Sequence, residues 1–156
     1  MFGKKKDKPE PKKLEKVTLK DISYPPKIIL AWAKSMDGHP QIAEWLRDNG
    51  YNELVMANHA INLKDEARAW LITNGYPHLM AMINACEGNE TAQKWLIVHG
   101  LDKLYHMALA IDGEMESWDW LGKNVPADIF LLTQTIKKIK DNIEESHNDI
   151  HTFGRD

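Results

Sequence analysis

The residue type best suited to nucleophilic chemistry occurs once in this chain, as Cys86. A thiol becomes reactive when it is accessible and a neighbouring base lowers its pKa, and His78 or His106 is the candidate base. The positions equivalent to Cys86 in the repeat described below are all apolar: Met36, Ile61, Ile111 and Ile136. Because a buried cysteine behaves as a small hydrophobic residue, the sequence predicts a packing role for Cys86.

A second candidate is the pair His147 and His151, which a helix would place one turn apart on one face. Glu144 lies three residues before His147, and this ligand set can hold a divalent metal. Histidines near a helix end are more often solvated, and the sequence assures no further ligand. We therefore expect no metal and no cofactor, and keep His147 and His151 as the candidates for a metal site.

No other pattern for catalysis or ligand binding stands out. Asp37-Gly38 and Asp112-Gly113-Glu114 lack the twelve-residue ligand spacing of a calcium loop, so they are interpreted as turns and helix starts. The sequence has no glycine-rich phosphate loop and no Gly-x-Ser-x-Gly elbow. These observations predict a protein that is not an enzyme; an enzyme using Cys86 or the histidine pair is the least favoured alternative.

Charge is distributed unevenly along the chain. Residues 1–20 hold eight lysines against three acidic residues, a balance of +5, so the net charge of −3 leaves −8 for residues 21–156. Residues 1–20 also contain two prolines and few apolar residues, and are predicted to be disordered. Six lysines of this tail are candidates for contact with a membrane or a nucleic acid: Lys4, Lys5, Lys6, Lys8, Lys12 and Lys13.

A solubilising linker is the favoured interpretation of this tail. Five net charges contribute roughly 5 kcal/mol at an anionic membrane, which gives only weak attachment, and no lipidation motif adds a second anchor. The acidic body would repel a nucleic acid. A peripheral membrane or nucleic-acid tether stays open as the alternative function.

The composition is typical of one soluble domain. The chain has 156 residues, of which 43% are hydrophobic, and no apolar run approaches the roughly 18 residues of a membrane span. A single cysteine excludes an internal disulfide and favours a reducing compartment. We therefore expect a cytoplasmic protein.

A Trp-Leu pair recurs every 25 residues, beginning at Trp45, Trp70, Trp95 and Trp120. The repeats cover residues 41–65, 66–90, 91–115 and 116–140, after a half-repeat at 27–40. Each repeat contains two short helices, because apolar residues stand at i, i+3 and i+4 on both sides of a central Asn-Gly or His-Gly stop. The Trp is interpreted as the large side chain that each hairpin buries against the next.

This register predicts an all-α fold, a right-handed stack of antiparallel helical hairpins, also called an α-solenoid. The helical repeat domain is expected to span residues 21–148. The second helix of the last repeat continues without a stop signal. A long C-terminal capping helix is therefore predicted from Ala127 to Asn148, with a tail at residues 149–156.

Positions that face away from the repeated core vary in type between repeats, and varying outer positions are how solenoids build binding surfaces. If Ile72, Ile97 and Val98 are exposed, they form an apolar patch of the kind that marks an interface. Drift without function is the alternative. The candidate protein-binding residues are Arg47, Met56, His59, Ile72, Thr73, His78, Ala81, Asn84, Ile97, Val98 and His106.

The segment WLITNGYPHLMAMI, from one helix through Asn-Gly-aromatic into the next, resembles the helix–turn–helix part of an ankyrin repeat. The Thr-Pro-Leu-His opening of that family is absent, and 25 residues leave no room for its β-hairpin. The resemblance implies a curved helical stack that binds other proteins. The predicted function is a protein-interaction module with an unidentified protein partner.

Overall fold

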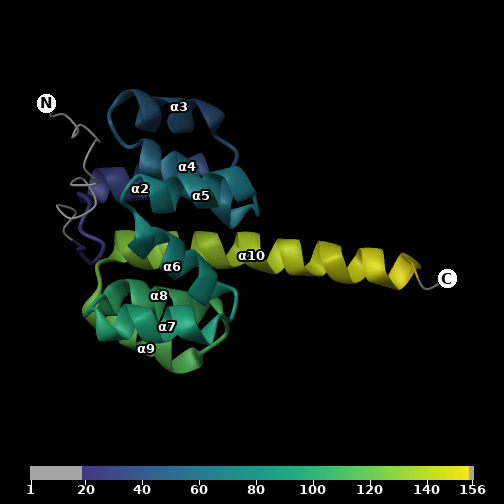
Figure 1. The fold of residues 1–156 in the computed structure, drawn as a ribbon. Helices are drawn as coiled ribbons and strands as arrows, with labels where there is room; N and C mark the ends of the chain where they lie inside the picture. The colour runs from purple at the N-terminus through teal and green to yellow at the C-terminus, as the bar shows by residue number, and fades with distance from the viewer. Residues whose placement is uncertain (1–18, 155–156) are drawn as a thin grey trace, which may run out of the picture.

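The computed structural model describes residues 19–154, with side chains up to residue 147, and is all-helical over that range (Figure 1). The predicted all-α class is confirmed, whereas the right-handed sense of the stack stays a prediction. The helices are α2 (Pro26–Ser35), α3 (Pro40–Asp48), α4 (Asn52–Ile61), α5 (Asp65–Thr73), α6 (Pro77–Cys86), α7 (Glu90–Val98), α8 (Asp102–Ile111), α9 (Met115–Asn124) and α10 (Ala127–Gly154).

Two classes of helix alternate along the chain. The outer helices α3, α5, α7 and α9 are the first helices of the repeats, and the inner helices α2, α4, α6, α8 and α10 are the second. Each outer helix packs against the inner helix before it and the inner helix after it. The hairpins are therefore stacked in chain order, as the register predicts.

The turns explain why these helices are so short. Gly75 follows α5 with φ 93°, in the left-handed region that favours glycine, and the Asn74 amide donates to the Trp70 carbonyl at 2.9 Å. Leu63 takes the same conformation, φ 70°, in a turn where the next repeats have Gly88 and Gly113. A leucine in this conformation costs about 1–2 kcal/mol. Because glycine is the turn signal in the other repeats, the sequence pattern did not mark this turn.

The inward positions of the inner helices form the core, as the spacing predicts. Trp32 of the half-repeat is fully buried, and its indole Nε1 donates to Oδ1 of Asn58 in the next repeat at 2.7 Å. The Asn58 amide in turn donates to the Ser35 hydroxyl at 2.9 Å. Other fully buried members are Ile29, Leu54, Ile61, Leu79, Met82, Ile83, Leu104 and Met107.

The prediction for the repeated tryptophans holds only in part: Trp70, Trp95 and Trp120 pack against the core without being fully buried, and Trp45 is exposed. Trp45 is 39% exposed, and Trp70 and Trp95 are only half-buried, whereas Leu71 and Leu96 beside them are completely buried. The leucine occupies the centre of the buried helical face, and the larger indole lies at its edge. The outer helices are therefore held mainly by the leucine of each Trp-Leu pair.

Helix α10 does more than cap the last repeat. It packs against α8, its neighbour in the series, and also against α2 at the opposite end of the chain. Because α2, α4, α6 and α8 also pack in sequence, the five inner helices close into a ring. The helix also runs to Gly154 and not to the predicted Asn148, since no helix-stopping residue precedes Gly154. Its C-terminal half projects from the body (Figure 1).

The N-terminal strap, residues 19–25, lies at the end of the ring where the inner helices begin. The Asp21 carboxylate accepts the backbone N–H groups of Lys103 and Leu104, at 2.7 and 3.0 Å, at the start of α8. The Tyr24 hydroxyl donates to Glu53 at the start of α4, at 2.8 Å. The carboxylates of Asp21 and Glu53 lie at the starts of α8 and α4, where the positive end of a helix dipole favours a negative charge.

Candidate functional site

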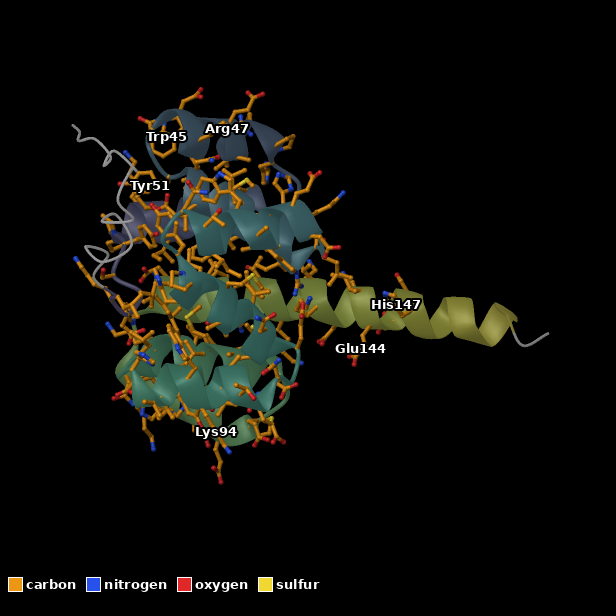
Figure 2. All side chains as sticks on the ribbon, viewed as in Figure 1. Trp45, Arg47, Tyr51, Lys94, Glu144 and His147 are labelled. Atoms are coloured by element: carbon orange, nitrogen blue, oxygen red, sulfur yellow. The ribbon has the colours of Figure 1, made fainter. Side chains whose placement is uncertain are left out.

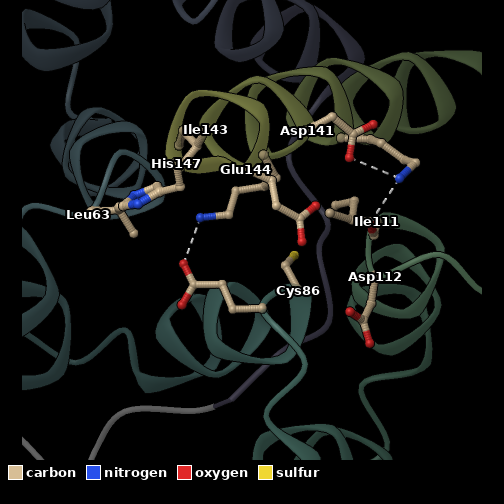
Figure 3. A pocket seen from close by; sticks show the side chains of 11 residues that line it. Leu63, Cys86, Ile111, Asp112, Asp141, Ile143, Glu144 and His147 are labelled. Atoms are coloured by element: carbon tan, nitrogen blue, oxygen red, sulfur yellow. Dashed lines mark hydrogen bonds and ion pairs between the residues drawn. The ribbon is translucent and has the colours of Figure 1, made fainter. Parts of the chain in front are cut away.

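The C-terminal pocket is a cavity of about 310 Å³ at the other end of the ring, where α4, α6 and α8 end against α10 (Figure 3). Its walls combine apolar and charged side chains, among them Leu63, Cys86, Glu87, Ile111, Lys140 and His147. The last turns of three inner helices thus meet around one face of α10.

Two lysines of α10 neutralise these helix ends. Lys140 donates from Nζ to the Ile61 carbonyl at 3.0 Å and to Glu87 Oε2 at 2.7 Å. Lys137 donates to the Ile111 carbonyl at 3.3 Å. Terminal carbonyls have no partner within their own helix and carry the negative end of its dipole. The lysines therefore serve an architectural purpose and fasten α10 to α4 and α8.

Glu87 is the centre of this charge network. It accepts two hydrogen bonds from the Arg68 guanidinium, at 2.6 and 3.2 Å, in addition to the one from Lys140. Burial alone would raise its pKa, but the bonds from Arg68 and Lys140 outweigh burial and hold the pKa of Glu87 below its ordinary value. At neutral pH Glu87 is therefore a carboxylate in the pocket wall, paired with Arg68 and Lys140.

The next repeat makes the same connection with different side chains. Arg68 also donates to the Ala60 carbonyl at 3.0 Å, and Gln93 donates to the equivalent Ala85 carbonyl at 3.0 Å and to Asp112 at 3.3 Å. Both pairs, 68 with 87 and 93 with 112, are separated by 19 residues. Sequence reasoning missed this network, although the equal spacing was a signal that could have revealed it.

Cys86 lies at the pocket but is buried, and its Sγ contacts Met82 Sδ at 3.5 Å. Burial raises the pKa of the Cys86 thiol far above its ordinary value, which disfavours the thiolate needed for attack. The candidate bases do not approach it: His78 is on the strap side of α6, and His106 stacks on Trp120 with ring centroids 4.0 Å apart. The packing role predicted for Cys86 agrees with this placement.

The candidate metal pair is only partly described. His147 is exposed near Glu144 on α10 (Figure 2), and both residues line the C-terminal pocket, whereas the side chain of His151 lies outside the described residues. Among the side chains that the structure describes, no group of three or more His, Cys, Asp or Glu residues is placed to hold a metal. The six tail lysines also lie outside the described residues, and their contacts stay predictions.

The histidine on the strap side has an unusual environment. The Nδ1 atom of His78 is buried without a hydrogen-bond partner among the described residues. Burial lowers the pKa of His78, against an opposing effect of the Asp21 charge. A neutral His78 at physiological pH is therefore part of the seam between α6 and the N-terminal strap.

The outer aliphatic set consists of Ile72 on α5 and Ile97 and Val98 on α7. These side chains are 53%, 44% and 77% exposed, respectively. Ile72 and Ile97 are equivalent positions in the register, one residue after the buried leucines of their repeats. The condition set for these three residues, that their side chains are exposed, is met, and large aliphatic side chains kept in water on successive repeats are typical of an interface.

The other candidate binding residues fall into two groups. Arg47, His59 and Thr73 are exposed. Half-buried side chains make up the second group: Met56, His78, Ala81, Asn84 and His106. Asn84 accepts from Arg68 at 3.3 Å and His106 Nδ1 lies 3.1 Å from the Ser117 hydroxyl, so both have internal partners. The accessible candidates are thus mainly on the outer helices.

Four further exposed apolar residues, besides Trp45, were not among the candidates: Leu30, Leu63, Met115 and Leu131. Met115 at the start of α9 is 74% exposed, and Leu131 on α10 is 43% exposed. The register places Leu131 at the same outward-facing position as His106, but it does not tell whether a following helix covers that position. None of the helices within residues 19–154 has the length and apolar character needed to cross a membrane.

Comparisons of this chain with protein-family models, with curated proteins and with solved structures found no significant match.

Proposed function

We propose that this protein is a non-enzymatic interaction module that binds another protein through its outer helices. The observation that carries the proposal is the exposure of Ile72, Ile97 and Val98 at repeated positions. Burying one such side chain at an interface contributes about 1.5–3 kcal/mol, so a few of them suffice for specific binding.

The closed ring supports an outward-facing site. A helical solenoid commonly binds through its concave side, but here the inner helices pack against one another and α10 joins both ends of the series. Side chains in the centre, such as Met82, Met107 and Leu132, are completely buried. The accessible, variable positions are those of the outer helices, which is where we place the binding surface.

The chemistry of the C-terminal pocket also favours binding over catalysis. Its thiol is buried and its charged groups Glu87, Lys137 and Lys140 are already engaged with one another or with helix ends. Such pairing holds helices together and gives these three charged groups a structural role. A free buried thiol also suits the reducing cytoplasm, the location we propose.

The test is affinity capture from an extract of the source cells with matched variants of the full chain. Ile72→Asp combined with Ile97→Asp places charges in the proposed surface, and we expect at least tenfold less of a specific partner. The control combines Gln41→Asp with Thr91→Asp, two exposed polar positions on outer helices, and should capture as the wild type does. Equal capture by all three proteins contradicts the proposal.

A photocrosslinking residue at position 98 then identifies contact directly. Val98 is the most exposed member of the outer aliphatic set, so its replacement by benzoylphenylalanine leaves the fold intact. We expect a covalent adduct with the captured partner. The same residue at position 41 serves as the control, and adducts at position 41 alone would place the interface elsewhere.

A further inference from the structure

The inner helix α10 lacks a neighbour that earlier inner helices have. α4, α6 and α8 each pack against the outer helix that follows them. Within residues 19–154 no outer helix follows α10, because it continues straight to Gly154. In the register, Lys138 stands where earlier turns have Gly88 and Gly113, which take left-handed conformations. At Lys138 the chain makes no such turn and α10 continues, so the face of α10 that an outer helix would cover stays open.

The exposure of equivalent residues shows this difference. In α8, His106 is covered by α9, through stacking on Trp120 at 4.0 Å and a contact of 3.1 Å with the Ser117 hydroxyl. The equivalent residue of α10 is Leu131, which is 43% exposed. In the earlier repeat an outer helix covers this position, so an exposed apolar side chain here indicates a surface to which a further helix can bind.

A groove of about 560 Å³ lies beside this face, between α9 and α10. Trp118 and Phe130 form its aromatic wall, with ring centroids 5.3 Å apart. Lys137 and Asp141 also line the groove and pair with each other at 3.2 Å, whereas Lys138 is exposed and makes no ion pair among the described residues. The groove therefore suits a helix that carries acidic residues.

The chain itself carries a helix of this chemistry. Residues 141–154 form the C-terminal half of α10, and they stand in the register where earlier repeats have an outer helix. Figure 2 shows Glu144 and His147 on this segment; both also line the C-terminal pocket, and the helix extends past the body beyond them. The segment has no lysine or arginine and four acidic residues: Asp141, Glu144, Glu145 and Asp149.

We propose that two copies of this chain form a symmetric dimer through antiparallel α10 helices, each laying its residues 141–154 in the groove of the other. Inner and outer helices of one chain are also antiparallel neighbours, so the second copy restores the packing that α10 lacks. Such an isologous contact closes on itself and forms a dimer and not a filament.

The charge pattern fixes the register of the pair. Lys138, Asn142 and Glu145 lie on one face of α10, at spacings of four and three residues. An antiparallel pair with its two-fold axis at Asn142 brings Lys138 of each copy beside Glu145 of the other. The same alignment carries the last turns of each helix toward Trp118 and Phe130 of the second copy.

Analytical ultracentrifugation of the full chain tests the dimer. We expect the wild type to sediment at twice the mass of one chain, and Lys138→Glu, Glu145→Lys and Leu131→Glu each to weaken dimerisation at least tenfold. The double variant Lys138→Glu with Glu145→Lys exchanges the charges and should restore the dimer. All substituted side chains are exposed, and thermal melts followed by circular dichroism verify that each variant is folded.

Crosslinking locates the axis. Packed helix axes lie about 8–10 Å apart, so a short bismaleimide should join two Asn142→Cys chains, whereas the buried native Cys86 does not react. Lys94→Cys on α7 is the control and should stay uncrosslinked. A wild type that is monomeric at hundreds of micromolar, a dimer insensitive to Leu131→Glu and Lys138→Glu, or crosslinking at position 94 alone overturns the proposal. The groove is separate from the outer aliphatic set, so this result and that of the capture experiment are independent.

Discussion

At the scale of single residues, the Trp-Leu pairs show what spacing can and cannot predict. The 25-residue register correctly predicts that both side chains share one face of an outer helix. It does not tell which of the two lies at the centre of that face. The structure places Leu71 in full contact with the core and leaves Trp70 half-buried, stacked on Tyr76 at 6.0 Å.

Stability measurements distinguish these two contributions. Leu71→Ala should lower the free energy of unfolding by about 2–5 kcal/mol, because it leaves a cavity in a fully buried site. Trp70→Ala should cost less, about 1–2 kcal/mol, because part of the indole is already in water and its removal leaves no closed cavity. Urea unfolding followed by circular dichroism gives both values, and a larger loss for Trp70→Ala would restore the tryptophan as the principal packing residue.

Glu87 gives a prediction for pH dependence. Its pKa is held below the ordinary value of 4.5, so its stabilising effect is complete above that pH and is lost as pH falls through the lower folded-state value. Glu87→Gln should cost about 1–2 kcal/mol at pH 7 and should flatten the loss of stability below pH 4.5. Unfolding titrations from pH 7 to 3 test this; Glu44→Gln, at an exposed site, is the control, and parallel curves for Glu87→Gln and the wild type contradict it.

At the scale of elements, local signals predicted helices well and long-range contacts poorly. Stop glycines and apolar spacing located the short helices. Asp21 contacts Lys103 and Leu104, which follow it in the sequence by 82 and 83 positions, and no local pattern in either segment predicts this contact. A strap that caps a distant helix is visible only once the ring has formed.

The strap can be tested by its cap. Asp21→Ala removes a carboxylate that accepts two backbone N–H groups at the start of α8, and should cost about 1–2 kcal/mol. Amide hydrogen exchange should rise in residues 103 and 104. Ser23→Ala alters an exposed residue of the same strap and should change neither quantity. Unchanged exchange at α8 in Asp21→Ala would exclude the capping role.

At the scale of the whole molecule, the sequence predicted the stack but not its closure. Repetition shows that neighbouring hairpins pack alike, yet whether the first and last units meet depends on the small rotation added at each repeat, which no residue type specifies. Lys137 and Lys140 fasten α10 to its neighbours, whereas the sequence alone suggests that they belong to the charged, solvent-facing side of the last helix. The same limit applies to the site: register places both the outer aliphatic set and Leu131 away from the buried stripe, but it does not tell which of these positions a neighbouring helix covers.

Closure by α10 is the central claim, because it fills the interior and leaves binding to the outside. Amide hydrogen exchange of Leu132→Ala tests it directly, since Leu132 is a completely buried residue of α10. In a closed ring, weakening α10 should lower protection in α2, residues 26–35, as well as in α8, while Gln134→Ala at an exposed site of the same helix leaves both unchanged. In an open stack each repeat depends only on its neighbours. Loss of protection confined to α8, α9 and α10, with α2 as protected as in the wild type, would contradict the account.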